Sequence, residues 1–383
     1  MRNTKDGIFG GAAREVKRPV PDLPFCAEAR LRGRKNKLTE SKSAMTKIEL
    51  FRKTGICRLG TKERGFKYRH AEHSRVRAAD LQRIRQLRIP PAWNEVWINS
   101  AAGGSIQAIG RDAAGRWQYL YHADHVRRQE ARKFKRLIKF AQALPKMRAT
   151  VATHIRQPGL GRETVMASIL RILSRCFLRP GSQAYASENG SFGLATLRRR
   201  HVRVRGDVVE FDFTGKSGVQ QQRQLRDRRV SKIVRDLLKH PSREVFKYQN
   251  GDGVFVNVTR HHINDYIQEV MGEHFSAKDF RTWAGTLVCA CALARVGTEV
   301  VEEGATRKRR VVGAVQETAD LLGNTPAVCR SAYICPEVIN GFEKGRVIRR
   351  FFKSPNELVS YRGQGLHVAE KSLLAFMKRS SAG

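Results

Sequence analysis

The spacing of apolar residues changes near His125, and this change constrains the fold more than any other feature of the sequence. Before it, Val96–Ile98 and Trp117–Tyr121 are short alternating runs between glycine turns, which is typical of strands. One short helix is predicted over Ala79–Leu87, where Pro90 and Pro91 follow its end. After it, apolar residues recur at helical spacing, as in the predicted helices at 126–144 and 162–178. We therefore predict an α+β protein: a small, mainly β domain at 46–125 and a mostly helical domain at 126–345.

One β segment interrupts the helical part. Apolar residues alternate over 202–204 and again over 209–213, and a third strand is predicted to run through Leu225, giving a three-stranded β-hairpin insertion. The turn Thr214-Gly215-Lys216-Ser217 ends like a phosphate-binding P-loop. However, Glu210 stands where that motif needs its first glycine, and the segment joins two strands instead of a strand and a helix. Lys216 is therefore expected at a hairpin tip, where a solvated lysine is the ordinary interpretation.

The charge of the chain points to its partner. The 383 residues carry 73 Lys and Arg against 35 Asp and Glu, a formal net charge of +38. Such a surface repels itself unless it meets a polyanion. We interpret residues 1–45 as a basic flexible N-terminal extension, although Met45 is an alternative start, and residues 346–383 as a basic C-terminal tail. No run of eighteen apolar residues predicts a membrane span, and no signal peptide is recognised at the N-terminus.

The cysteines favour a reducing compartment. Seven are present, without any C-x-x-C pair, and Cys289 and Cys291 lie in an apolar stretch. Buried free thiols in the cytoplasm are the expected state, and neither a structural metal nor a small-molecule cofactor is predicted.

Four short segments contain residues that suit phosphate chemistry, but each also has an ordinary explanation. Arg179 is expected at a helix C-terminus, where a cation suits the dipole. Arg281 is a potential ion-pair partner of Asp279, Asn324 follows Gly323 as in many turns, and Tyr333 is a potential half-buried aromatic.

Taken together and in this order, the segments resemble the type IB DNA topoisomerases of the bacterial and poxvirus-like branch. The resemblance covers about Gly55 to Pro336. The motifs that carry it are Ile89–Trp93 with Val96–Ile98, Gly110–Asp112 with Gly115-Arg116 and Gln118–His122, Glu188–Leu194, the hairpin at 214–219, Arg281–Gly285, and Leu322–Cys329.

The resemblance implies a catalytic domain of the tyrosine recombinase and topoisomerase IB type, with a role for each matched residue. Tyr333 matches the nucleophile, which forms a 3′-phosphotyrosyl bond and frees a 5′-hydroxyl. Arg179 and Arg281 match the arginines that hold the scissile phosphate, and Lys216 matches the general acid for the leaving oxygen. Asn324 stands where most members have a histidine that donates to a non-bridging oxygen.

Two departures from the family pattern lie close to these positions. Pro180 follows Arg179 where relatives tend to have an aliphatic residue, and a proline disfavours helical geometry at the residue before it. Cys335 replaces a histidine expected in the bacterial branch. Neither change removes a catalytic side chain, so we expect activity to be slowed and not lost.

The resemblance also implies a surface that contacts DNA. Gln118, Tyr119 and Tyr121 are expected to face the major groove, although tyrosines packed inside the sheet are the alternative. Four basic residues are assigned to the same contact, although a basic run is usually a solvated face: Arg111, Arg116, Arg127 and Arg128.

The chemistry of these residues agrees with the implied roles. A tyrosine ester conserves the energy of the broken phosphodiester bond, so religation requires no ATP. Fixed guanidiniums stabilise the negative charge of the transition state, so a divalent metal becomes unnecessary. Asn324 donates a hydrogen bond but exchanges no proton at neutral pH.

We therefore expect a monomeric, cytoplasmic, nucleoid-associated enzyme that clamps double-stranded DNA, cuts one strand and lets it swivel. A tyrosine recombinase or integrase is one alternative, although it usually shows H-x-x-R where this chain has Lys278–Arg281. A non-catalytic, DNA-compacting basic protein is the other.

Overall fold

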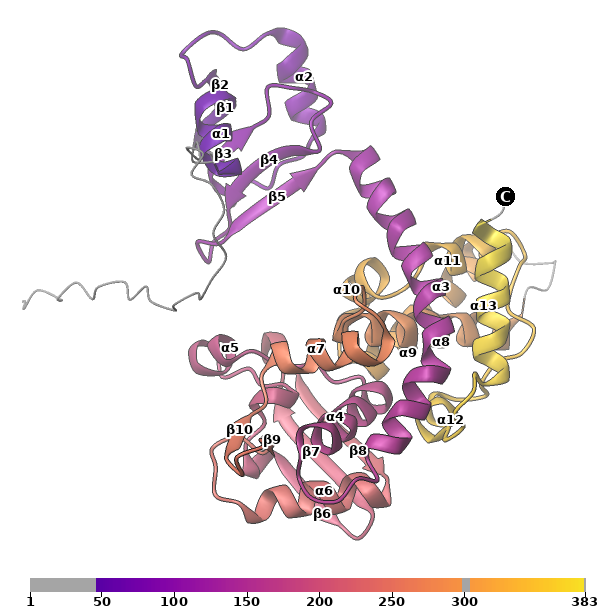
Figure 1. Cartoon of the computed structure of the whole chain (residues 1–383). Coiled ribbons are helices and arrows are strands. Elements are labelled where there is room, and N and C mark those ends of the chain that lie inside the picture. Colours follow the sequence, from indigo (N-terminus) through magenta and orange to yellow (C-terminus); the bar gives the residue numbers. More distant parts are fainter. Residues whose placement is uncertain (1–45, 298–303, 382–383) are drawn as a thin grey trace, which may run out of the picture. The chain divides into compact units, whose positions relative to one another are not determined.

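The structure is a computed structural model that describes residues 46–297 and 304–381 (Figure 1). The predicted N-terminal extension at 1–45 lies outside the described residues. Contacts divide the chain into two units. One contains the described residues up to Ala102 together with Gln107–Leu120, and the other contains Gly103–Ile106 and the chain from Tyr121 onward.

The first unit is rich in strands, as predicted. Its five-stranded sheet has the order β2-β1-β3-β4-β5, with β1 pairing antiparallel to both β2 and β3. Ile56, Val96 and Ile98 from this sheet pack with Ile84 of the helix α2 in a small core. The elements of this part are α1 (Lys47–Thr54), β1 (Ile56–Thr61), β2 (Gly65–His70), α2 (Ala78–Gln86), β3 (Asn94–Ile98), β4 (Ile106–Arg111) and β5 (Trp117–Tyr121).

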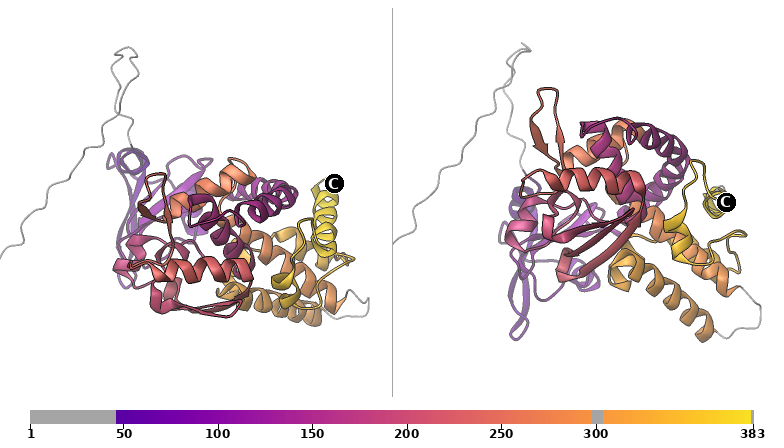
Figure 2. Two further views of the ribbon diagram at one scale, coloured as in Figure 1. Left: turned by 60° about the horizontal axis from the view of Figure 1, so that its bottom comes forward. Right: turned by 90° about the horizontal axis from the view of Figure 1, so that it is seen from below.

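The second unit is mostly helical and contains the larger core. The helix α8 contacts most of the other long helices of this unit, and its residues from Phe280 to Ala294 are buried without a break. Figure 2 shows the helices of this unit from two further directions. Its helices are α3 (Ala123–His154), α4 (Arg162–Cys176), α5 (Gln183–Glu188), α6 (Arg228–Lys239), α7 (Arg260–Met271), α8 (Ala277–Val296), α9 (Gly304–Leu322), α10 (Pro326–Ala332), α11 (Pro336–Glu343), α12 (Pro355–Ser360) and α13 (Val368–Ser381). Short 3₁₀ turns lie at Leu194–Thr196, Arg199–His201 and Lys216–Gly218.

An antiparallel sheet of order β6-β7-β8 lies within this helical unit. In β7, Val209, Phe211 and Phe213 face the core while the residues between them are more exposed, as the alternating sequence indicates. A two-stranded ribbon, β9 with β10, was not predicted. The strands are β6 (Val202–Arg205), β7 (Val208–Thr214), β8 (Gln220–Arg226), β9 (Lys247–Gln249) and β10 (Phe255–Asn257).

The helix α3 continues ten residues beyond the predicted end at Leu144, through Pro145. A proline inside a helix removes one backbone hydrogen bond, which is why the sequence suggested an end there. Leu144, Met147 and Val151 nevertheless follow at helical spacing and are all buried. Burial of this apolar face offsets the lost hydrogen bond.

The segment at 346–383, interpreted from the sequence as a basic tail, is folded over its described residues. α13 packs against α3 and α8 (Figure 1), and Ala369, Leu373 and Met377 are fully buried in the same core as α8. The apolar residues of α13 recur at the spacing of one helix face, and burial of that face stabilises the segment. The basic residues of α13 lie on its exposed face.

The described cysteines are free thiols, and all of them except Cys57 are buried. Cys26 lies outside the described residues. Among the described helices, none is long and apolar enough to cross a membrane.

Candidate active site

The five residues expected to act on a phosphodiester all belong to the helical unit but come from five different places in it. Tyr333 caps the C-terminus of α10, and Arg281 lies in the second turn of α8. Arg179 follows α4, Asn324 follows α9, and Lys216 lies in the turn between β7 and β8. The structure brings the first four together.

Tyr333 is placed by a close contact between its backbone and α8. Thr325 caps the N-terminus of α10 by accepting a hydrogen bond from the backbone N of Val328, and Pro326 occupies the first position of the helix. At the other end, a Cβ atom on Gly285 would lie 2.9 Å from the carbonyl oxygen of Tyr333. Only glycine at this position lets the backbone of Tyr333 approach α8 so closely.

The neighbouring residue of α8 fixes the chain after Tyr333. The Thr286 hydroxyl accepts a hydrogen bond of 3.1 Å from the backbone N of Cys335. Cys335, the second departure from the family pattern, is buried, and burial raises the pKa of its thiol to about 12. Its side chain is therefore an uncharged packing group at neutral pH.

Arg281 is the central residue of the cluster. Its side chain is only 2% exposed, and its guanidinium donates to the carbonyl oxygens of Phe177 and, at 2.8 Å, Leu322. These bonds hold it against the ends of α4 and α9, and its Cζ atom lies 4.9 Å from the centroid of the Tyr333 ring. Its Nε atom is buried and has no hydrogen-bond partner among the described residues.

Arg281 is not the ion-pair partner of Asp279 that the sequence suggested. Asp279 caps α8 by accepting from the backbone N of Ser276 at 2.8 Å, and it forms an ion pair of 2.5 Å with Arg136 of α3. In a helix, residues two positions apart point in different directions, so Asp279 and Arg281 do not face each other.

The arginines change the acidity of Tyr333. Burial alone raises the pKa of the phenol, but the charges of Arg281 and Arg179 outweigh it, so the pKa lies below its usual range. Burial, and then repulsion from Arg179, lower the pKa of Arg281 to about 10. Arg281 stays protonated at neutral pH, and the site therefore stabilises negative charge on the phenol oxygen.

Arg179 and Asn324 are joined directly, because a guanidinium nitrogen of Arg179 donates to the side-chain oxygen of Asn324. The Nδ2 group of Asn324 is buried and has no hydrogen-bond partner in the described parts of the chain. The amide therefore has its oxygen committed to Arg179 and its two N–H donors free for an acceptor such as a phosphate oxygen.

The expected placement of Arg179 at a helix C-terminus was wrong. α4 ends at Cys176, and Phe177 adopts a left-handed conformation with φ of 52°. Arg179 therefore lies outside the helix. Pro180 disfavours helical backbone geometry at Arg179, but no such geometry is needed there.

The loop that carries Arg179 is held by the end of the Glu188–Leu194 motif, which the sequence analysis used for the family resemblance without assigning it a structural role. The backbone N of Leu194 donates to the carbonyl oxygen of Arg179 at 3.0 Å, and two residues earlier Phe192 donates to Thr214 at 2.9 Å. A Cβ atom on Gly193 would lie 2.6 Å from the Arg179 carbonyl oxygen. The segment thus links the Arg179 loop to the end of β7. In the sequence, Gly193 was the only sign that another part of the backbone approaches closely here.

Lys216 does not join the cluster. It is exposed in the β7–β8 turn and, within the described residues, makes no hydrogen bond or ion pair. The start of β8, directly after the turn, however, lies next to Gly323, the residue before Asn324. Gln221 is 4% exposed, and its side-chain amide would be 2.5 Å from a Cβ atom on Gly323.

A half-buried lysine of α3 also supports the Tyr333 loop, and its role was missed from the sequence. The Nζ atom of Lys133 donates to the carbonyl oxygen of Ala332 at 2.6 Å. Burial, and then the charge of Lys278, lower its pKa. The basic run in which it lies gave no sign that one member points inward.

The residues expected to contact DNA from the first unit are partly engaged with one another. Asp112 pairs with Arg116 at 2.8 Å and accepts from Gln118 at 2.8 Å. Arg111 pairs with Glu95 at 3.0 Å and lies over the ring of Trp117. Tyr119 is 38% exposed, and strand alternation puts Gln118 on the opposite face, beside Leu120, which packs on the core.

The remaining expected contacts lie at the start of the helical unit. Tyr121 is 44% exposed and stacks on His125, with 5.2 Å between the ring centroids. Arg127 pairs with Asp124, and Arg128 is exposed. Packing of the tyrosines inside the sheet, the alternative interpretation, is excluded by these exposures.

Comparison with known proteins places the chain in a family. Residues 123–342 match the family described as "Eukaryotic DNA topoisomerase I, catalytic core", and residues 65–112 match "Bacterial DNA topoisomerase IB, N-terminal domain". The chain is 32% identical over 285 residues to the DNA topoisomerase 1B of Acanthamoeba polyphaga mimivirus, covering 73% of this chain and 85% of that relative. It is 22% identical over 234 residues to the DNA topoisomerase 1B of Vaccinia virus (strain Copenhagen), covering 60% and 70%. This chain therefore belongs to the type IB DNA topoisomerases, which are isomerases.

Proposed function

We propose that this chain relaxes supercoiled duplex DNA by transient cleavage of one strand through Tyr333. The observation that carries the proposal is the grouping of Tyr333, Arg281, Arg179 and Asn324, in which the phenol is acidified and buried donors have no acceptor among the described residues. These features suit a phosphodiester, whose non-bridging oxygens accept hydrogen bonds from guanidiniums and amides.

Each residue of the cluster has a part in the proposed reaction. The phenol of Tyr333 loses its proton to solvent and its oxygen attacks the phosphorus, the bond to the 5′-oxygen breaks, and a 3′-phosphotyrosyl ester forms. Arg281 and Arg179 stabilise the charge that gathers on the phosphoryl oxygens, and Asn324 Nδ2 donates to one of them. The released strand end swivels, and the 5′-hydroxyl then attacks the ester and restores the DNA.

Lys216 is proposed to protonate the leaving 5′-oxygen. Its hairpin is anchored beside Asn324 through Gln221, while its own side chain is exposed at the tip. We infer that DNA binding brings the tip of the β7–β8 hairpin to the scissile bond, because a general acid must reach within hydrogen-bonding distance of the leaving oxygen.

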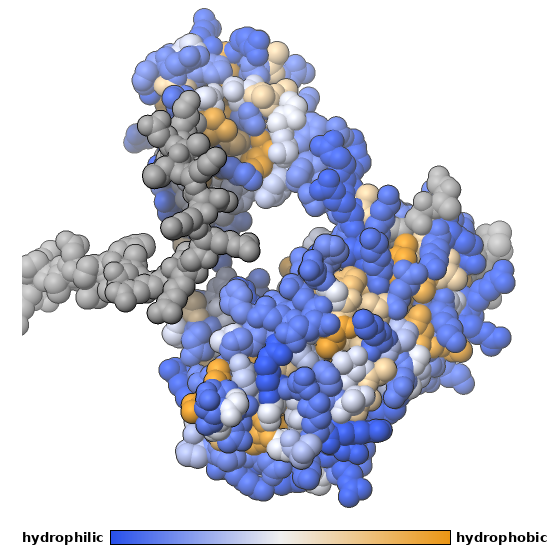
Figure 3. Space-filling model, in the orientation of Figure 1, coloured by the Kyte–Doolittle hydropathy of each residue, from blue (hydrophilic) through white to orange (hydrophobic). Residues whose placement is uncertain are grey.

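We further propose that the domains at 46–125 and 126–345 clamp DNA as a monomer on the nucleoid in the cytoplasm. Figure 3 shows hydrophilic residues over most of the visible face of the second unit. The net charge of +38 supports extensive contact with phosphates, so affinity should fall steeply as salt rises.

The test is relaxation of a supercoiled plasmid in EDTA, without nucleotide, across a series of salt concentrations. We expect relaxation of both positive and negative supercoils, without a requirement for ATP or a divalent metal. Gel retardation of the plasmid without relaxation at any salt concentration would instead support a DNA-compacting protein with a degenerate site.

A further inference from the structure

A cavity of about 220 Å³ lies in the helical unit between α3, α4 and the segment that joins α12 to α13. Its walls combine two kinds of side chain. One part is apolar and includes Phe177, Phe280 and Trp283, and most of the charged side chains are arginines. The arginines that line the cavity are Arg148, Arg156, Arg171, Arg175 and Arg362.

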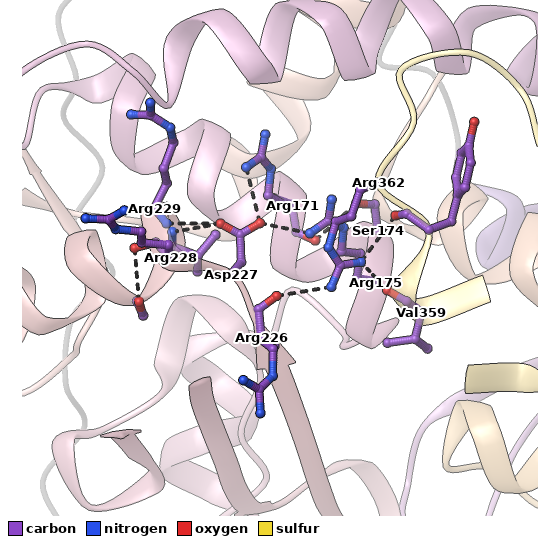
Figure 4. Close-up of polar contacts among 12 residues, drawn as sticks. Arg171, Ser174, Arg175, Arg226, Asp227, Arg228, Arg229, Val359 and Arg362 are labelled. Atoms are coloured by element: carbon purple, nitrogen blue, oxygen red, sulfur yellow. Dashed lines mark hydrogen bonds and ion pairs between the residues drawn. The ribbon is translucent and has the colours of Figure 1, made fainter. Parts of the chain in front are cut away.

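Two carboxylates pair with three of these five guanidiniums. Glu370, which is almost fully buried, accepts hydrogen bonds from both terminal nitrogens of Arg148, at 2.7 and 3.0 Å. One oxygen of Asp227 is shared by Arg171 at 3.2 Å and Arg175 at 2.8 Å (Figure 4). Its other oxygen accepts from backbone amides at the start of α6, so Asp227 has no capacity left for a further arginine.

The other two arginines form no ion pair with a carboxylate of the described residues. Arg362 donates to the backbone oxygens of Val359 at 2.7 Å and Arg226 at 3.0 Å (Figure 4). The guanidinium of Arg156 makes no hydrogen bond or ion pair with any described residue. Burial, and then the charge of Arg362, lower the pKa of Arg175 to about 10. The cavity therefore contains an excess of positive charge.

We propose that this cavity binds a small phosphate-bearing anion of about the size and charge of pyrophosphate. Guanidiniums bind phosphate oxygens through paired N–H donors, and an anion would relieve the repulsion between Arg175 and Arg362. The apolar wall leaves room for an organic group attached to the phosphates. The site is independent of the proposed cleavage reaction, because none of the residues assigned to that reaction lines it.

The first experiment is calorimetric titration of the full chain with sodium pyrophosphate at constant ionic strength. The test variant is Arg156→Gln combined with Arg362→Gln, because both side chains are exposed and neither supports a carboxylate. The matched control is Arg235→Gln, an exposed arginine that also donates to a backbone oxygen, that of Gly206, outside the cavity.

We expect one pyrophosphate per chain, bound at least about tenfold more weakly by the double variant and unchanged in the control. Absence of saturable binding to the unaltered chain would overturn the proposal. Equal affinity in the double variant would also overturn it, because pyrophosphate would then bind elsewhere, for example at Arg179 and Arg281.

A second variant tests whether more positive charge beside the cavity increases its affinity for pyrophosphate. Asp227→Asn keeps a side-chain acceptor for the amides of α6 but removes the negative charge beside Arg171 and Arg175. Pyrophosphate should therefore bind several-fold more tightly, and unchanged or weaker binding would contradict the proposal.

Backbone phosphates of DNA carry the same chemistry as a free anion, so the titration is repeated with a short duplex at saturation. We expect pyrophosphate to bind the unaltered chain with the same affinity. Loss of binding in the presence of duplex, together with weaker duplex binding by the double variant, would assign the cavity to DNA and overturn the small-anion proposal.

Discussion

The guanidinium carbon of Arg281 lies 4.9 Å from the centroid of the Tyr333 ring, and the same guanidinium is fixed by the carbonyl oxygens that end α4 and α9. A buried cation that cannot move away from a phenol favours the phenolate. This arrangement provides a tyrosine that is more acidic than a free one before any substrate binds.

The pH dependence of cleavage should report this relationship. Because the charge of Arg281 helps to lower the pKa of Tyr333, the cleavage rate should rise with pH and level off below the pH at which a free tyrosine ionises. Replacement Arg281→Gln removes the cation, so the plateau should move to higher pH and the rate at neutral pH should fall roughly a hundredfold or more. Single-turnover cleavage of a suicide duplex between pH 6 and 10 measures both effects. An unshifted profile would show that Arg281 does not set the acidity of the nucleophile.

Gly285 should be essential for the position of Tyr333. The change Gly285→Ala puts a Cβ atom 2.9 Å from the Tyr333 carbonyl oxygen, so the backbone must move or the helix must yield. We expect a loss of stability of about 1–3 kcal/mol and a larger proportional loss of cleavage than of DNA binding. Gly313→Ala is the matched control, because this helical glycine of α9 has open space around it. Normal cleavage by Gly285→Ala would refute the tight contact.

Lys133 should act as a positioning residue for the Tyr333 loop. Lys133→Met keeps the length and apolar stem of the side chain but removes the bond to the Ala332 carbonyl oxygen. We expect cleavage to slow by about tenfold while duplex affinity stays nearly unchanged. The exposed Lys139→Met on the same helix removes one charge as well and serves as the control. Equal effects of the two substitutions on cleavage would mean that only the lost charge matters.

Lys216→Ala should slow cleavage without abolishing it and without lowering the melting temperature, because the side chain is exposed and makes no hydrogen bond or ion pair with the described residues. A substrate whose 5′ leaving group needs no proton should restore most of the rate, since the general acid is then unnecessary. A rate defect that persists with such a substrate would assign Lys216 to DNA binding instead.

Strands and helices with a clear apolar period were predictable, while long-range packing was not. Val209, Phe211 and Phe213 alternate in the sequence and in burial alike. By contrast, α3 continues through Pro145 and the segment after residue 346 folds, because both bury apolar faces on elements distant in the chain.

In the candidate site too, the sequence predicted the main residues but not the long-range contacts that position them. The catalytic side chains were proposed from their order along the chain and from the family resemblance. The residues that hold them in place were not predicted. Gly285 contacts Tyr333, Gly193 contacts Arg179, and Lys133 donates to Ala332. The members of these pairs are 48, 14 and 199 positions apart in the sequence. Sequence spacing does not reveal which distant stretch of backbone a glycine or a half-buried lysine will contact.

The most direct test of the account is the identity of the nucleophile. The unaltered chain and Tyr333→Phe are incubated with a suicide duplex, denatured and digested, and the peptide bound to DNA is identified by mass spectrometry. We predict a 3′-phosphotyrosyl link at Tyr333 in the unaltered chain, and no covalent DNA with Tyr333→Phe although its duplex affinity is retained. Covalent capture or plasmid relaxation by Tyr333→Phe would contradict the central claim.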